Sequence, residues 1–394
     1  MRKKSLFLFG IAVAFFMVIG AAYAEIPVYP VKGKVVNVLG AFDNPEGALC
    51  SMDGKWLFVS NSALHGDANK PFGWVEGGGS ISRCEIGPNG ELKMDSRIFI
   101  KDLTGPLGMA VLNVNTNKFP RGTIFATAGS GPMALPDGTP ITDPKRHKPK
   151  LLAFDPDSGK ILGEIKLCAN SIFAKINGAP LILVNALAFD KKGNLYIVDT
   201  GFGYDTYKPA FPYKGGVWKI PVESIDALAE GKTPASLPQF IFNQSWPDGV
   251  EVSPITGKVW YNTVMPPNDA DPFKGAYWAV DDSDFKMGAQ PAPLAKGLGR
   301  LDGLDFTVRG TCIQTEILGS PGPPNSIVVT PVGGPPYKLA LEPDVVLSGP
   351  ADVDIKTLAD GSYLLFVPEL TALDPTPWDD EVTVIWLPAN FDQP

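Results

Sequence analysis

The sequence predicts an all-β fold, a six-bladed β-propeller made of four-stranded antiparallel blades. Three observations favour this prediction. The 394 residues include 42 Gly and 39 Pro, so long helices should be scarce and strands joined by turns common. A strand–turn–strand unit recurs six times along the chain, which is typical of repeat architectures. A lone strand pattern also precedes the first unit, where it is available to complete the last one.

Each unit opens with a short pattern, X-G-h-x-h or a close relative, in which h is apolar. The six openings are EGALC at 46, LGMAV at 107, NALAF at 185, DGVEV at 248, DGLDF at 302 and ADVDI at 351. A turn and a second strand follow: KWLFVSN, GTIFATAG, NLYIVDTG, KVWYNTV, GTCIQTE and SYLLFVPE. Most units then add further strands, such as GSISRCEI, KLLAFDP, GGVWKIP, GAYWAV and NSIVVTPV. Six such sheets around one axis would make a propeller.

The end of the chain and its beginning complement each other. The last unit offers ADVDI, SYLLFVP and VTVIWLP, whereas GKVVNVLG at 33–40 stands alone before the first unit. We expect this early strand to join the last blade and so remove an open sheet edge. The alternative is a pair of β-sandwiches or an irregular all-β chain, but six units in a common alignment favour the propeller.

The first 24 residues are expected to be a secretory signal peptide. Arg2, Lys3 and Lys4 precede an apolar run that ends in AYA, so cleavage is predicted after Ala24. An uncleaved anchor is the alternative, and no cysteine follows the site to suggest a lipoprotein. The remaining residues, 25–394, are expected to form one propeller domain, in a periplasm or outside the cell.

Charge and hydropathy narrow the choice of partners. Removing the signal peptide leaves 31 basic residues against the 42 acidic ones, a net charge of −11. This balance disfavours nucleic acid and anionic membrane as partners. No second long apolar run exists, so no membrane span is expected after cleavage. A small-molecule substrate or ligand is the partner class that we expect.

The four cysteines do not have the spacing of a metal motif. Cys50 and Cys84 are predicted on the first and third strands of one blade, about 9 to 10 Å apart at roughly 4.8 Å per strand. This separation is too large for a disulfide. The other pairings, which involve Cys168 and Cys312, stay open in a compartment where disulfides can form.

Position X of each unit is the first candidate for a site. X starts the innermost strand, at the same end of the sheet as the end of the second strand, so six X side chains should meet beside the central tunnel. They are Glu46, Leu107, Asn185, Asp248, Asp302 and Ala351. Asp-Gly is also common in turns, so a single match would indicate only a bend. A shared position for four oxygen-bearing side chains favours a metal site instead.

Ca²⁺ is the cation that this set of side chains would suit. Crowded carboxylates repel each other and raise each other's pKa values unless a cation neutralises them. Ca²⁺ accepts mixed carboxylate, amide and water ligands more readily than Mg²⁺ does. No nitrogen or sulfur ligand occurs at X, which argues against zinc and copper.

The units carrying these oxygens resemble a known family of calcium-dependent six-bladed propellers, the senescence marker protein/gluconolactonase type with its relatives the paraoxonases and diisopropylfluorophosphatases. The matching stretches are NPEGAL, VNALAFDKKGNLYIVDTG, WPDGVEV and RLDGLDF. The resemblance implies that Glu46, Asn185, Asp248 and Asp302 bind a catalytic Ca²⁺. The chain departs from the family pattern at Asp248, where Asn is common, and at Ala186 and Leu187, where Asn-Gly or Asn-Asp is usual.

The resemblance also implies a reaction. A Ca²⁺ with an open position would act as a Lewis acid on a lactone carbonyl or phosphoryl oxygen, and Asp302 is the expected general base. The loops after the second strands should cover the pocket and include His65 and His147, of which His65 is the better candidate for contact with substrate. Asp199 is a second candidate for contact with substrate, although it could equally cap a turn.

Two functions therefore stand side by side. The first is an exported Ca²⁺-dependent hydrolase of lactone or ester type. The second is a non-catalytic propeller that binds a ligand or a protein, in which a Ca²⁺ ion has a structural role. Fold alone does not choose between them, because propellers perform many unrelated functions. No G-x-S-x-G elbow or nucleotide-binding loop offers a third candidate chemistry.

Overall fold

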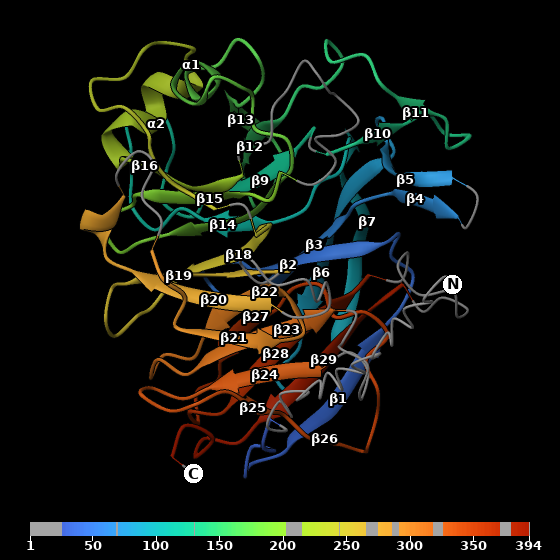
Figure 1. Ribbon diagram of the computed structural model, residues 1–394. Coiled ribbons are helices and arrows are strands. Elements are labelled where there is room, and N and C mark those ends of the chain that lie inside the picture. The colour runs from blue at the N-terminus through green and yellow to red at the C-terminus, as the bar shows by residue number, and fades with distance from the viewer. Residues whose placement is uncertain are drawn as a thin grey trace, which may run out of the picture.

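The computed structural model confirms the all-β prediction (Figure 1). It describes residues 26–67, 70–129, 131–201, 215–243, 245–264, 275–285, 291–317, 326–370 and 380–393. The predicted signal peptide lies outside these residues. Within them, the α-helices are the short α1 (Ile172–Asn177) and α2 (Val222–Ala229). Among the described helices, none has the length and apolar character needed to cross a membrane.

Five four-stranded antiparallel sheets follow one another along the chain, and we call them sheets 1 to 5. Sheet 1 contains β2 (Pro45–Cys50), β3 (Trp56–Asn61), β6 (Gly79–Ile86) and β7 (Leu92–Leu103). Sheet 2 contains β8 (Met109–Val111), β9 (Ile124–Ala128), β12 (Lys150–Phe154) and β13 (Ile161–Lys166). Sheet 3 contains β14 (Val184–Phe189), β15 (Leu195–Asp199), β16 (Gly216–Ile220) and β17 (Gln239–Phe242). Sheet 4 contains β18 (Pro247–Val252), β19 (Val259–Thr263), β20 (Gly275–Val280) and β21 (Ala295–Leu298). Sheet 5 contains β22 (Arg300–Phe306), β23 (Cys312–Ile317), β24 (Ser326–Thr330) and β25 (Tyr337–Lys338).

Sheet 6 combines strands from both ends of the described chain. It contains β27 (Asp354–Thr357), β28 (Tyr363–Glu369), β29 (Glu381–Leu387), β1 (Gly33–Leu39) and the short β26 (Leu341–Glu342). The early strand β1 pairs antiparallel with β29, as the sequence predicted, and β26 adds a parallel pair on its other side.

An accessory sheet lies outside this series and was not predicted from the sequence. It contains β4 (Leu64–Asp67), β5 (Lys70–Val75), β10 (Met133–Ala134) and β11 (Pro140–Ile141). These strands come from the two long connections that follow β3 and β9.

The first strands of the six sheets meet around one axis. β2, β8, β14, β18, β22 and β27 contact one another in that order, and β27 contacts β2. A cluster of buried apolar side chains lies between each pair of neighbouring sheets, including sheets 6 and 1. The arrangement is therefore propeller-like.

Strand β28 shows how the alternation of a strand supplies these clusters. Leu364 and Phe366 pack with sheet 1, whereas Tyr363 and Leu365 pack with sheet 5. The strand aromatics behave likewise: Tyr261 and Trp278, fully buried and stacked with their centroids 4.9 Å apart, belong to the cluster between sheets 3 and 4. These aromatics therefore serve as packing residues between sheets.

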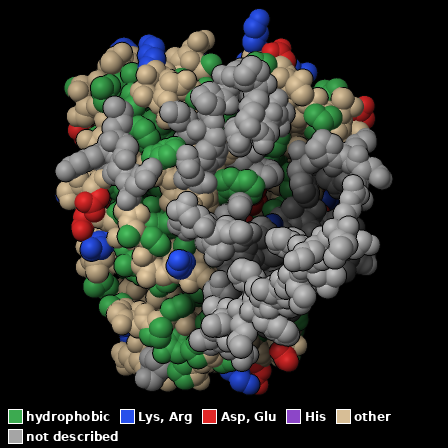
Figure 2. Space-filling model, in the orientation of Figure 1, with side chains coloured by type: hydrophobic (Ala, Val, Ile, Leu, Met, Phe, Trp, Pro, Cys, Tyr) green, Lys and Arg blue, Asp and Glu red, His purple; other side chains and the backbone are tan. Residues whose placement is uncertain are grey.

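The cysteines are unpaired. Cys50, Leu57 and Cys84 lie in one row across β2, β3 and β6. Strand β3 therefore separates the two cysteines of sheet 1, as predicted. Cys168 and Cys312 are likewise free thiols. Charged side chains of both signs are scattered over the described part of the face in Figure 2, without a continuous basic surface.

The glycine after X is required by the close approach of the first strands. A Cβ atom on Gly108 would overlap the carbonyl oxygen of Asn185 and lie 2.8 Å from the Cα atom of Ala186. Cβ atoms on Gly47 and Gly249 would likewise overlap the carbonyl oxygen of the next X residue. The Asp-Gly pairs lie within strands β18 and β22, so the turn interpretation of this motif is wrong.

Hydroxyl and amide side chains at the ends of the second strands hold the first strands together. Ser60 Oγ accepts a hydrogen bond from the Gly47 N–H at 2.7 Å and donates to the carbonyl of Leu107 at 2.6 Å. Thr127 Oγ1 accepts from the Leu107 N–H at 2.9 Å. Thr315 Oγ1 donates to the carbonyl of Ala351 at 3.2 Å. Backbone groups of the crowded first strands are thereby satisfied.

Substitution of Gly108 by Ala should destabilise the fold, because the new methyl group has no space beside the backbone of β14. We expect the free energy of unfolding to fall by about 3 kcal/mol, as in other overpacked cores. Gly40→Ala is the matched control, because a Cβ there meets nothing within 4 Å, and its effect should stay below about 1 kcal/mol. Urea denaturation would compare them, and equal losses would contradict the packing argument.

Candidate functional site

The four oxygen-bearing X side chains line a single cavity of about 140 Å³ between the first strands. They are Glu46, Asn185, Asp248 and Asp302, which we call the first tier. The three carboxylic acids are only 5 to 8% exposed. The two apolar X residues, Leu107 and Ala351, belong instead to an apolar cluster. The structure thus brings together the four residues that the sequence singled out, each from a different sheet.

A β-bulge lies at X in each strand that carries one of these oxygens. In β18, Pro247 pairs with Thr263 of β19 and Val250 pairs with Tyr261. An advance of three residues along β18 therefore corresponds to an advance of two residues along β19. The same shift occurs in β2, β14 and β22. A bulge inserts one unpaired residue and changes which side of the strand the next residues occupy. Residues three positions apart can therefore line the same cavity.

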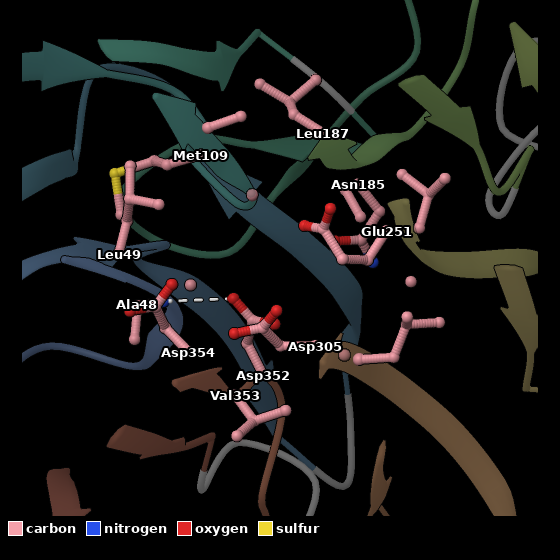
Figure 3. A pocket seen from close by; sticks show the side chains of 18 of the residues that line it. Ala48, Leu49, Met109, Asn185, Leu187, Glu251, Asp305, Asp352, Val353 and Asp354 are labelled. Carbon is pink, nitrogen blue, oxygen red and sulfur yellow. Dashed lines mark hydrogen bonds between the residues drawn. The ribbon is translucent and has the colours of Figure 1, made fainter. Parts of the chain in front are cut away.

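The bulges reveal acids that the sequence analysis missed. Glu251 and Asp305, at X+3 of sheets 4 and 5, line the cavity with Asp354 of sheet 6 (Figure 3). We call these three the second tier. They are partly exposed, unlike the first-tier acids. The repeated acid in DGVEV, DGLDF and ADVDI was the available signal, but simple alternation would have placed it on the wrong side of the strand.

Asp352 connects the two tiers. It stands where other units have the glycine, and its Oδ2 accepts a hydrogen bond from the Ala48 N–H at 3.2 Å, drawn in Figure 3. Its charge raises the pKa of Glu46 in the first tier and of Glu251 in the second. The wall near β8 and β14 is apolar, with Met109 and Leu187. The cavity is therefore acidic on one side only.

Hydrogen bonds satisfy some of the first-tier oxygens and leave one without a partner. Asp248 Oδ1 accepts from the Asn185 amide and from Thr200 Oγ1, the latter at 3.0 Å. Glu46 Oε2 is buried and has no hydrogen-bond partner among the described residues. A buried carboxylate oxygen without a partner is costly unless a proton or a cation compensates it.

Burial and mutual repulsion raise the pKa values of these acids. Burial raises the pKa of Glu46 and of Asp302 well above the usual range, and the charge of Asp248 adds to both effects. Burial also raises the pKa of Asp248 to about 7, although the hydrogen bonds from Thr200 and Asn185 oppose it. Burial raises the pKa of Glu251 to about 8.

The donor set fits a hard cation such as Ca²⁺. All first-tier donors are carboxylate or amide oxygens, and the unpartnered Glu46 Oε2 is available as a ligand. Within the described residues, no set of three carboxylate, thiol or imidazole groups is already close enough together to coordinate a metal ion. Binding would therefore require the side chains to turn toward the ion, with the Asn185 oxygen in place of its NH₂ group.

Asp199 lies apart from this cavity. It is fully buried, and its Oδ1 accepts hydrogen bonds from the N–H groups of Ile182, Leu183 and Gly201 at 3.0 to 3.1 Å. These contacts are those of a side chain that caps a turn. Burial raises the pKa of Asp199 to about 7, with the three N–H donors opposing it.

The two histidines were the other candidates. The backbone of His65 lies in β4, and its side chain lies outside the described part of the structure. His147 is buried, with Nε2 2.9 Å from the carbonyl oxygen of Leu181, and burial lowers its pKa to about 4. The structure thus places His147 away from the acidic cavity, on the wall of a separate surface cleft.

Part of the predicted loop cover is present at the X end of the cavity. Leu64 and Trp74 of the accessory sheet pack with the X residues Leu107 and Ala351. Leu183, Ile317 and Leu370 complete this buried cluster, which we call the apolar cap. The connection that follows β3 therefore contributes apolar side chains next to the first tier.

Comparison with known proteins supports the fold. A gluconolactonase from Xanthomonas campestris is 12% identical in sequence and superposes with a TM-score of 0.50. The match covers 92% of this chain and 97% of the gluconolactonase chain. A PQQ-bound aldose sugar dehydrogenase from Streptomyces coelicolor is 12% identical, with a TM-score of 0.54, and the match covers 92% of this chain and 99% of that chain. The PQQ domain of a pyranose dehydrogenase from Coprinopsis cinerea is 13% identical, with a TM-score of 0.51, and the match covers 91% of this chain and 98% of that chain. Identities this low show the fold alone.

Comparisons by sequence found no relative. No known family's sequence profile matches the chain, and no curated protein matches it.

The raised pKa values predict that the metal-free protein loses stability as pH rises. The folded-state pKa of Asp248, about 7, exceeds the unfolded value of about 4, so the folded protein holds more protons between these limits. Stability should be greatest near pH 4 to 5 and fall toward pH 8. In EDTA, Asp248→Asn should flatten this fall by roughly 2 to 4 kcal/mol. The exposed-acid control Asp344→Asn should keep it, and identical pH profiles of melting temperature for both variants would contradict the argument.

Proposed function

We propose that this chain is an exported Ca²⁺-dependent hydrolase of lactone or ester type that acts on a small molecule at the central tunnel. The observation that carries the proposal is the convergence of four oxygen donors, from four sheets, on one cavity that holds the unpartnered Glu46 Oε2. The lactone class is suggested by the Xanthomonas campestris gluconolactonase, which has a similar fold. The resemblance of the four X motifs to calcium-dependent propellers supports the same class.

We further infer that residues 25–394 form one closed propeller of six blades. Apolar clusters between each pair of neighbouring sheets support this inference, as does the contact of β27 with β2. The pairing of β1 with β29 would close the last blade. A closed ring gives the first strands the fixed spacing that a metal site of four separate strands requires.

The chain's own residues would divide the chemistry as follows. Glu46, Asn185, Asp248 and Asp302 would hold the Ca²⁺ ion, which when bound supplies Lewis acidity and stabilises negative charge on the reacting oxygen. Asp302, which lies in the first tier beside the position of the ion, would take a proton from the attacking water. The apolar side chains of Met109 and Leu187 would exclude bulk water from that wall of the cavity.

A second function is favoured by the size of the cavity. A volume of about 140 Å³ accommodates an ion and a few water molecules, whereas ligand pockets usually span roughly 300 to 1,000 Å³. The first-tier acids are also almost completely buried. These observations support the alternative, a non-catalytic propeller in which Ca²⁺ neutralises the buried carboxylates and another surface binds a ligand or a protein.

Calorimetric titration of the metal-stripped protein with Ca²⁺ tests the shared part of both functions. The wild type should bind one ion, and Glu46→Gln/Asp302→Asn should lose at least about 100-fold in affinity, because two charged ligands are removed. A variant of equal charge change at exposed positions, Glu85→Gln/Asp344→Asn, should bind as the wild type does. Absence of binding by the wild type would remove both proposals.

Hydrolysis assays separate the two functions. The Ca²⁺-loaded protein should hydrolyse small lactones or aryl esters, and EDTA should abolish the activity. Asp302→Asn should lower kcat by at least about 100-fold if Asp302 is the general base. If the wild type binds Ca²⁺ and gains thermal stability from it but hydrolyses no member of the panel, the structural role of the ion is the better account.

Export makes a separate prediction. Expressed with its first 24 residues in a bacterial host, the protein should reach the periplasm or medium with Glu25 as its first residue, as intact mass would show. Recovery of the uncleaved chain in the membrane fraction would favour the anchor instead.

A further inference from the structure

We propose that the cation enters the tunnel from the end opposite X, guided by the second tier, Glu251, Asp305 and Asp354. This inference rests on the proposed function, because it concerns how the first-tier site is filled. It assigns a role to three acids that the candidate Ca²⁺ site does not use.

The X end offers a poor route for an ion among the described residues. The apolar cap packs against that end, with Leu107 and Ala351 fully buried in it. Trp74 of the accessory sheet belongs to the cap and is 5% exposed. A hydrated divalent ion would have to pass between buried apolar side chains there, which is unfavourable because its hydration would be lost without replacement.

The opposite end has the properties that a cation path requires. The second tier lies three residues further along its strands than the X positions, about 10 Å at the rise of a β-strand. Its acids are partly exposed, whereas the first-tier acids are only 5 to 8% exposed. No Lys, Arg or His is among the described residues that line the cavity. Solvent and cations therefore meet acidic side chains first at this end, and Glu251 is negatively charged above a pH of about 8.

An independent observation shows that the same cavity leads to a ligand position. Glu46 lines it, and its buried Oε2 accepts no hydrogen bond from any described residue. Asp352 lies between the two ends, because it follows X by one residue, lines the cavity and accepts a hydrogen bond from the Ala48 N–H. A cation at the second tier would thus remain close to carboxylates at each step toward Glu46.

The second-tier residues differ in how much structure depends on them. Asp305 Oδ2 accepts from the Ile355 N–H at 2.7 Å, and Asp354 Oδ2 from the Cys50 N–H at 3.0 Å, so both also join neighbouring strands. Among the described residues, Glu251 Oε1 accepts a hydrogen bond from the adjacent Val252 N–H at 2.7 Å, a contact that joins no neighbouring strand. Glu251→Gln is therefore the variant that removes charge with the least effect on packing.

Stopped-flow kinetics test the route. Ca²⁺-loaded protein is mixed with excess fluorescent chelator to give the dissociation rate, and division by the calorimetric Kd gives the association rate. At pH 9, where Glu251 is ionised, we expect Glu251→Gln to lower the association rate about threefold to tenfold and to weaken its dependence on salt. Glu85→Gln, the same change on the exposed outer part of β6, should leave both unchanged.

A steric variant gives a second, charge-independent readout. Val111 lines the cavity beyond Met109, so Val111→Phe should narrow the proposed entrance. Association and dissociation should then slow by a similar factor, with Kd within about twofold, because a barrier on the path affects both directions equally. Asp354→Asn serves as a further charge variant if Glu251→Gln does not fold.

The outcomes separate this inference from the proposed function. If the wild type binds no Ca²⁺, the metal site itself is wrong. If it binds Ca²⁺ and the rates of Glu251→Gln and Val111→Phe equal those of the wild type, the site stands and entry from the second tier is refuted. Slower association in Glu251→Gln and slower exchange at constant Kd in Val111→Phe would together support the route.

Discussion

The close approach of six first strands around one axis is the constraint on which the rest of the structure depends. Each strand comes so near to the next that a methyl group on Gly47, Gly108 or Gly249 would overlap a carbonyl oxygen of its neighbour. Backbone groups held this tightly must be hydrogen-bonded, and Ser60 and Thr127 at the ends of second strands meet that need. The same approach brings charged side chains of separate sheets within range of each other, so the electrostatics of the cavity follow from the backbone packing.

Much of this architecture was predictable from the sequence, because a repeat shows its own alignment. The six openings located the first strands, and the shared register predicted that Glu46, Asp248 and Asp302 would meet. The alternation of a strand also accounts for the packing of Trp278 between sheets. These inferences need only the period of a strand and the order of the units, both of which are local properties of the chain.

What sequence reasoning missed depended on departures from regular strands. The bulges at X shift the alternation by one residue, so Glu251 and Asp305 reach the cavity although simple counting places them elsewhere. The accessory sheet has strands as short as two residues within long connections, and these carry no periodic signal. Whether Asp199 caps a turn or contacts a ligand depended partly on the positions of the Ile182 and Leu183 N–H groups, which lie 17 and 16 residues away in the sequence and which no local pattern predicts.

The sheet shared by the two ends of the chain also affects how the protein can be made. Strand β29 takes β1 as its antiparallel neighbour, although Lys34 and Trp386, which face each other there, are synthesised far apart in time. Residues 33–39 must remain without their final partner until residues 381–387 have been synthesised. The exposed side chain of Val38 then lies on an unpaired strand able to pair with other chains. Pairing of β1 with β29 is thus a late step of folding, and a chaperone bound to residues 33–39 would prevent their association with other chains until then.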